Sequence, residues 1–183
     1  GGGQILAESL KGSMVVEGTL SAAAPVFGDK VSGENPGAGS INLKATAGEV
    51  QMGQKARLDV SGASGPSGSV NIDAASLVLT EAAREAASKN AALAQNGLDQ
   101  LVAASRNADG SGLGAFEVRQ RTGSLDLNTQ VKAALVALTA DKGQLSLGKA
   151  ADIDAKTASG GVVQLQAGQD LVLNDDAKID ASS

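Results

Sequence analysis

The strongest constraint in the sequence is a 13-residue pattern that recurs without a gap. It is present in residues 41–53 (INLKATAGEVQMG), 116–128 (FEVRQRTGSLDLN) and 136–148 (VALTADKGQLSLG). Apolar residues stand at the first, third, tenth and twelfth positions, and the eighth is glycine: Gly48, Gly123 or Gly143. Apolar residues at a period of two are typical of β-strands with one buried face. Each copy therefore predicts two short strands joined by a glycine turn.

Shorter copies extend the pattern over most of the chain. Residues 70–79 and 163–174 fit with tighter turns, and residues 5–16 form a degenerate copy. In three copies a third apolar residue follows six residues later, as Leu58, Ile153 or Ile179. The repeat unit is thus three short strands, and its copies start at residues 5, 41, 70, 116, 136 and 163.

Three short strands cannot bury an apolar face alone, but stacked copies can bury a continuous one. Parallel strands about 4.8 Å apart would place like side chains in inward ladders. The sequence therefore predicts an all-β fold. We expect a right-handed parallel β-helix, a β-solenoid with three strands per coil and about six coils, and one inserted α-helix. A narrow interior of this kind also explains the absence of Trp and Tyr. The expected outward positions are polar: Asn42, Lys44, Glu117, Arg119, Asp152, Asp154, Gln164 and Gln166.

Two stretches interrupt the repeats. Residues 23–39 hold two of the three prolines and predict a loop insertion. Residues 80–105 predict a helical insertion, in which residues 80–96 form a helix of about four turns capped by Thr80. Residues 98–105 could extend that helix, but we expect a strand, because Asn96-Gly97 is a turn dipeptide.

Composition excludes several kinds of chemistry. The chain has no His and no Cys, so it offers neither a Ser-His-Asp or Cys-His nucleophile nor an imidazole or thiolate metal site. A net charge of −5 argues against nucleic acid as a partner. No run of 18 apolar residues is present, so we expect no membrane-spanning segment. We expect no enzyme activity and no cofactor. We interpret residues 1–183 as one β-helix segment of a longer chain, because residues 1–3 are glycines without an initiator Met.

The candidate partner-binding residues are few. Arg106, Arg119 and Arg121 could form a basic cluster for a sulfated glycan or phosphate, although pairing with carboxylates such as Glu117 is the commoner role of such side chains. Phe27 in the first insertion is a further candidate, as are Glu85 and Lys89, an i,i+4 pair in the second.

Acidic residues suggest two further sites, and both have a simpler interpretation. The runs 107–111 and 174–176 are rich in oxygen ligands but lack the full spacing of a calcium loop, so we interpret them as solvated turns. Outward aspartates on the expected strands could pair as a glycosidase acid and base, but an exposed acidic sheet face is the ordinary expectation.

Three phrases resemble the repeats of the filamentous haemagglutinin family, the large exoproteins that Gram-negative bacteria export by two-partner secretion. They are GSMVVEGTLSA (12–22), ARLDVSGASGPSGSVNI (56–72) and GGVVQLQAGQDLVLNDDAKIDASS (160–183). The resemblance covers nearly the whole chain apart from residues 23–39 and 80–112, and the family's conserved secretion domain is not visible. It implies a structural segment of a secreted, cell-surface adhesin with a role in virulence. It also implies an outer-membrane secretion pore as export partner and a host-cell, bacterial or glycan receptor.

Two alternatives remain open. The same β-helical architecture would suit the stalk of a contact-dependent growth inhibition effector, whose toxin lies at the far C-terminus of the parent chain. A glycan-binding or polysaccharide-lyase type β-helix is the third hypothesis, because fold alone does not determine function.

Overall fold

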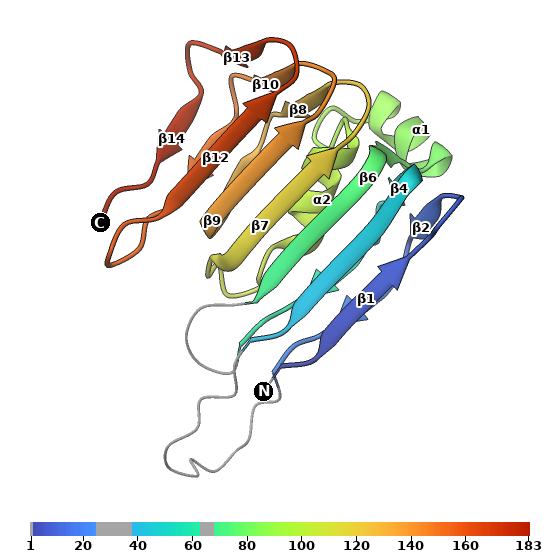
Figure 1. The fold of residues 1–183 in the computed structure, drawn as a ribbon, viewed down its shortest axis with the longest axis horizontal. Coiled ribbons are helices and arrows are strands. Elements are labelled where there is room, and N and C mark those ends of the chain that lie inside the picture. Colours follow the sequence, from blue (N-terminus) through green and yellow to red (C-terminus); the bar gives the residue numbers. More distant parts are fainter. Residues whose placement is uncertain (1, 25–37, 63–67) are drawn as a thin grey trace.

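The computed structural model describes residues 2–24, 38–62 and 68–183, which form mainly β-strands and two helices (Figure 1). The strands are β1 (Gln4–Glu8), β2 (Met14–Val16), β3 (Thr19–Ser21), β4 (Ser40–Met52), β5 (Arg57–Asp59), β6 (Ser69–Leu79), β7 (Leu113–Gln120), β8 (Leu125–Leu127), β9 (Gln130–Ala140), β10 (Leu145–Leu147), β11 (Asp152–Asp154), β12 (Val162–Ala167), β13 (Leu171–Leu173) and β14 (Lys178–Asp180). Every strand pairing among these residues is parallel. The prediction of a β-rich chain with parallel sheets is therefore confirmed. Most of the predicted loop 23–39, Phe27 included, lies outside the described residues.

The repeat alignment agrees with the strand register. Strands β1, β4, β6, β7, β9 and β12 lie side by side in that order and form one long sheet (Figure 1). The first residues of the repeat copies pair with one another in turn: Ile5, Ile41, Val70, Phe116, Val136 and Val163. The six residues at which the sequence places the copy starts thus stand in register along the long sheet.

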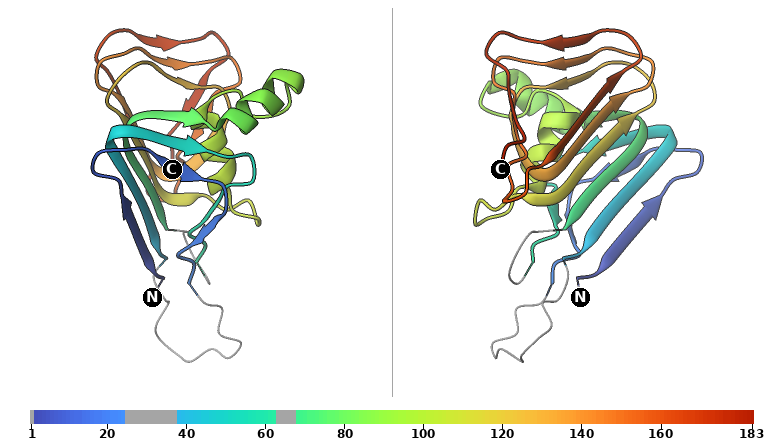
Figure 2. Two further views of the ribbon diagram at one scale, coloured as in Figure 1. Left: turned by 90° about the vertical axis from the view of Figure 1, so that its right-hand side faces the viewer. Right: turned by 60° about the vertical axis from the view of Figure 1, so that its left-hand side comes forward.

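The second and third strands of the copies form shorter parallel sheets, visible behind the long sheet in Figure 2. The second strands form two groups that pair in register. One group consists of β8, β10 and β13, and the other consists of β2, the end of β4 and the end of β6. The third strands form two separate groups, β3 with β5, and the start of β9 with β11 and β14. A gap therefore divides the third face between the copies that start at residues 41 and 116.

Inward and outward positions follow the expected alternation. The first-position residues Ile41, Val70, Phe116 and Val136 are fully buried. None of the outward residues predicted from the sequence is buried. One apolar cluster runs along all the copies and forms the core.

The insertion after β6 contains two helices, whereas the sequence predicted one. Helix α1 (Glu81–Lys89) begins as expected, with the Ala83 N–H donating to Thr80 Oγ1 at 3.2 Å. It ends seven residues earlier than predicted, because the Gln95 amide donates to the carbonyls of Ala87, Asn90 and Leu93 and closes a chain reversal.

The predicted strand at residues 98–105 is wrong. Residues Gly97–Ser105 form helix α2, and the Asp99 N–H donates to Asn96 Oδ1 at 2.8 Å. Asn96 therefore caps a helix instead of making a hairpin turn. Leu98, Leu101 and Val102 have the i, i+3, i+4 spacing of a helix face, and all three are buried.

Glycines allow the turns of successive copies to approach closely. A Cβ added at Gly143 would lie 2.0 Å from the carbonyl oxygen of Gly123, which is far inside van der Waals contact. Gly123 itself has a φ of +74°, a left-handed conformation that favours glycine. The eighth position of the repeat thus requires glycine for two separate reasons.

We predict that Gly143→Ala destabilises the chain by about 1–3 kcal/mol, because the backbone of one turn must move away from the next. The control is Gly18→Ala, since nothing lies within 4 Å of a Cβ at Gly18. Urea unfolding followed by circular dichroism measures both variants. Equal free energies of unfolding would contradict the proposed role of the close approach.

Candidate functional site beside helix α2

Helix α2 lies where the copy that starts at residue 70 would otherwise place its third strand. It packs against β4, β5, β6 and β8 and fills the gap on the third face (Figure 1). The neighbouring strands therefore have edges that no strand covers, and their backbone groups need other partners.

Side chains supply several of these partners. The Asn128 N–H donates to Asp99 Oδ1 at 2.9 Å, and the Leu77 N–H donates to Gln120 Oε1 at 3.0 Å. Arg57 Nη1 donates to the carbonyl oxygen of Arg106, at the end of α2. Polar side chains thus replace part of the hydrogen bonding that a strand would give.

Asp99 is a buried carboxyl in this arrangement, with a residue exposure of 7%. Its second oxygen accepts from Asn96 Nδ2 at 3.2 Å. Burial raises the pKa of Asp99, although the hydrogen bonds from Asn128 and Asn96 act in the opposite direction. Negative charge at this position therefore has a free-energy cost in the folded state.

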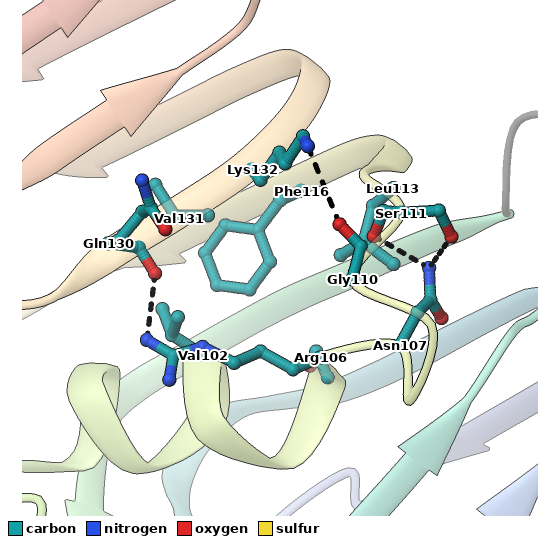
Figure 3. Close-up of a pocket in the computed structure, with 11 residues that line it drawn as sticks. Val102, Arg106, Asn107, Gly110, Ser111, Leu113, Phe116, Gln130, Val131 and Lys132 are labelled. Carbon is teal, nitrogen blue, oxygen red and sulfur yellow. Dashed lines mark hydrogen bonds between the residues drawn. The ribbon is translucent and has the colours of Figure 1, made fainter.

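A pocket of about 210 Å³ opens where α2 ends (Figure 3). Its floor is apolar and is formed by Val102, Leu113, Phe116 and Val131, all buried. Phe116 comes from β7 and Val131 from β9, so the pocket joins the helix to the sheet beside the gap.

Two cations stand at the rim of the pocket. Arg106 Nη2 donates to Thr129 Oγ1 at 2.9 Å and to the Gln130 carbonyl at 3.1 Å. Lys132 Nζ makes a long hydrogen bond of 3.4 Å to the Gly110 carbonyl. Among the described residues, neither side chain forms an ion pair, and no carboxylate lines the pocket.

The structure does not bring the three predicted arginines together. Arg106 contacts the first residue of β9, whereas Arg119 pairs with Asp141, beyond the other end of that strand, at 3.0 Å. Arg121 makes a bidentate pair with Asp73, at 2.7 and 2.9 Å. This pair lowers the pKa of Asp73. Arg119 and Arg121 thus pair with carboxylates, but with ones other than Glu117.

The remaining sequence candidates lie apart from the pocket. Glu85 and Lys89 form an exposed ion pair at 3.2 Å on α1. In the 107–111 run, Asp109 Oδ1 accepts hydrogen bonds from the Ser111 N–H and hydroxyl, and these bonds lower the pKa of Asp109. In the part of the chain that the structure describes, no group of three acidic side chains could hold a metal ion.

Sequence reasoning missed Asp99, Phe116, Gln120 and Lys132. Two of them were detectable as departures from the repeat. At the fifth position four of the other five copies have alanine (Ala45, Ala74, Ala140 and Ala167), whereas Gln120 is polar and buried. At the first position Phe116 is much larger than the Ile or Val of the other copies. Asp99 and Lys132 could not be recognised from the sequence, because their contacts depend on where α2 lies.

No family model, curated protein or solved structure matches the chain. None of the described helices combines the length and apolar character needed to cross a bilayer.

We predict that Asp99→Ala lowers the free energy of unfolding by about 1–3 kcal/mol, because the Asn128 N–H loses its acceptor. Asp99→Asn keeps an acceptor oxygen and should cost less. Because the pKa of Asp99 is raised on folding, its contribution to stability is greatest at low pH and falls as pH rises through the folded value. The stability of Asp99→Asn relative to the wild type should therefore improve from about pH 3 to pH 7.

Urea unfolding at several pH values measures this difference. Asp170→Asn, the same substitution at an exposed residue, is the matched control. A constant difference between Asp99→Asn and the wild type over the whole range would contradict the prediction.

Proposed function

We propose that this chain is a structural shaft segment, built as a right-handed parallel β-helix with three strands per coil and about six coils. The observation that carries the proposal is the continuous register of the six copy starts along the long sheet. Right-handed crossovers are the rule between parallel strands of one sheet, which supports the hand.

Exposed apolar ladder positions support a role in a longer stack. Leu145, Leu147 and Ile153 are fully buried, whereas their register partners Leu171, Leu173 and Ile179 are 46%, 53% and 42% exposed. Apolar surface of this kind suits the docking of a further coil, and a rod grows by repeating this step.

The shaft is best placed in a secreted, cell-surface adhesin of the filamentous haemagglutinin type. The sequence resemblance of residues 12–22, 56–72 and 160–183 supports this assignment. In this proposal the parent protein leaves a Gram-negative cell through its cognate outer-membrane pore. The rod then holds a distal binding region away from the cell, for attachment to host cells, other bacteria or matrix.

A coil removed in register should leave the rod intact. Deleting 138–164 joins Ala137 to Leu165, which is the register partner of Leu138, so every following residue keeps its face. Deleting 138–163 joins Ala137 to Gln164 and exchanges inward and outward residues in the rest of the strand. We expect the first deletion to keep a cooperative thermal transition and a β-type circular dichroism spectrum, and the second to lose both. Similar behaviour of the two variants would contradict the β-helix.

The adhesin assignment is tested in the source bacterium. Antibodies against this segment should label intact cells, and disruption of the gene should reduce attachment to host cells or to other bacteria at least severalfold. Absence of surface labelling would overturn the proposal. Unchanged attachment with loss of neighbour killing would support a growth inhibition stalk instead, and binding of the purified segment to a glycan array would support the glycan-binding alternative.

A further inference from the structure

We propose that the last coil of one chain, formed by β12, β13 and β14, stacks on the first coil of a second copy of this chain, formed by β1, β2 and β3. Copies of the chain then associate head to tail into a longer rod. The inference rests on the proposed β-helix and goes beyond it, because it identifies one partner for both coils and the direction in which they stack.

Both coils have open strand edges. Among the described strands, β1 and β2 pair only with β4, and β3 pairs only with β5. At the opposite end of the long sheet, β12, β13 and β14 pair only with β9, β10 and β11 (Figure 1). Each of these six strands therefore has one edge whose N–H and C=O groups face no described strand. Such an edge is a template for pairing with another chain.

Neither coil has the features that commonly protect an edge from pairing, such as proline, inward-pointing charges or a covering helix. The six strands contain no proline. Their inward-facing residues are all apolar. Both helices pack mainly on β4, β5, β6 and β8, between the two ends. The described residues therefore leave both coils open to a partner.

The inward residues of the two coils match one another. Continuing the register between two copies sets three apolar pairs side by side: Met14 and Leu171, Val16 and Leu173, and Leu20 and Ile179. Within one chain, the first coil already makes pairs of this kind with its own neighbour: Met14 with Val50, Val16 with Met52, and Leu20 with Leu58. Leu171, Leu173 and Ile179 are exposed, so stacking would remove their apolar surface from water.

The outward residues of the two coils are also compatible. Strand β14 reads Lys-Ile-Asp, and β5, the existing partner of β3, reads Arg-Leu-Asp. A second chain's β14 would therefore place a cation beside Thr19 and a carboxylate beside Ser21, as β5 does on the other side of β3. On the second face, the exposed Val15 would lie beside Val172. In this register no two like charges stand opposite each other on the six strands.

Head-to-tail stacking suits these coils better than a junction of two like ends. Translation along the rod keeps the strands of all three faces parallel, with β12 on β1, β13 on β2 and β14 on β3. A two-fold axis at one end would reverse the strand direction and make every new pair antiparallel. Every pair among the described strands is parallel. A head-to-tail junction leaves one coil open at each end, so the assembly continues to grow.

Two variants test the junction by analytical ultracentrifugation. Met14→Lys places a charge in the first coil, and Leu171→Lys places one in the last coil. The wild-type chain should form polymers whose mean mass rises with concentration. Each variant alone should stay monomeric, because every junction needs one intact first coil and one intact last coil. An equimolar mixture of the two should form a dimer and nothing larger, since each variant keeps the coil that the other has lost.

Leu20→Lys and Ile179→Lys provide a second pair of blocked coils, which should behave in the same way. The control is Ala82→Lys at an exposed residue of α1, which should polymerise like the wild type. Circular dichroism of every variant shows whether it keeps a β-type spectrum, so a blocked junction can be separated from unfolding.

A wild-type chain that is folded and monomeric at about 1 mM would overturn the head-to-tail junction and leave the proposed shaft unaffected. A wild-type chain without a β-type spectrum would overturn both. Dimers of either blocked variant alone would indicate a symmetric junction of like ends and would also overturn the inference. The same holds if the mixture of folded, blocked variants stays monomeric.

Discussion

The strands of successive copies pair in parallel and in register, so each residue lies beside the residue at the same repeat position in the next copy. An inward residue is therefore packed mainly by residues of its own kind above and below it, as Val136 is by Phe116 and Val163. A copy without a neighbour would leave its apolar face in water, so burial depends on the stack. The same constraint acts on the turns, where Gly143 must fit against the backbone of the preceding turn. Repeat spacing, small corner residues and a core of branched aliphatics are thus consequences of one geometry.

Helix α2 shows what happens where that geometry is interrupted. A helix satisfies its own backbone hydrogen bonds and offers none to a strand edge, so the two sheets beside it lose a neighbour. The chain responds with long polar side chains, since Gln120 and Asp99 each accept a hydrogen bond from an uncovered N–H group. Burying Asp99 opposes ionisation, and this cost is tolerated because an unpaired N–H group would also be costly.

The sequence predicted the regular part of the fold because its information is local and repeated. Apolar residues two apart define the strands, and six copies identify the register even where single copies are degenerate, as in residues 5–16. Residues 98–105 were predicted wrongly because Asn96-Gly97 suits both a turn and a helix start, and the choice depends on Asp99 and on packing against β6. The sequence also did not indicate which residues would pair with the outward-facing charged side chains. Arg121 pairs with Asp73, 48 positions away, only because their strands are neighbours.

Unlike charges face one another across neighbouring strands of the stack. On the outer face of the long sheet, Glu8, Lys44, Asp73 and Arg119 stand opposite one another on successive strands, so unlike charges alternate along the stack. Neighbouring charges of opposite sign reduce the field of this face and need no external partner. Beside the interruption, Lys132 stands opposite Asp154 on β11, and the charge of Arg106 acts on the buried carboxyl of Asp99. The matching of unlike charges on neighbouring strands therefore continues on the third face, up to the edge of the interruption.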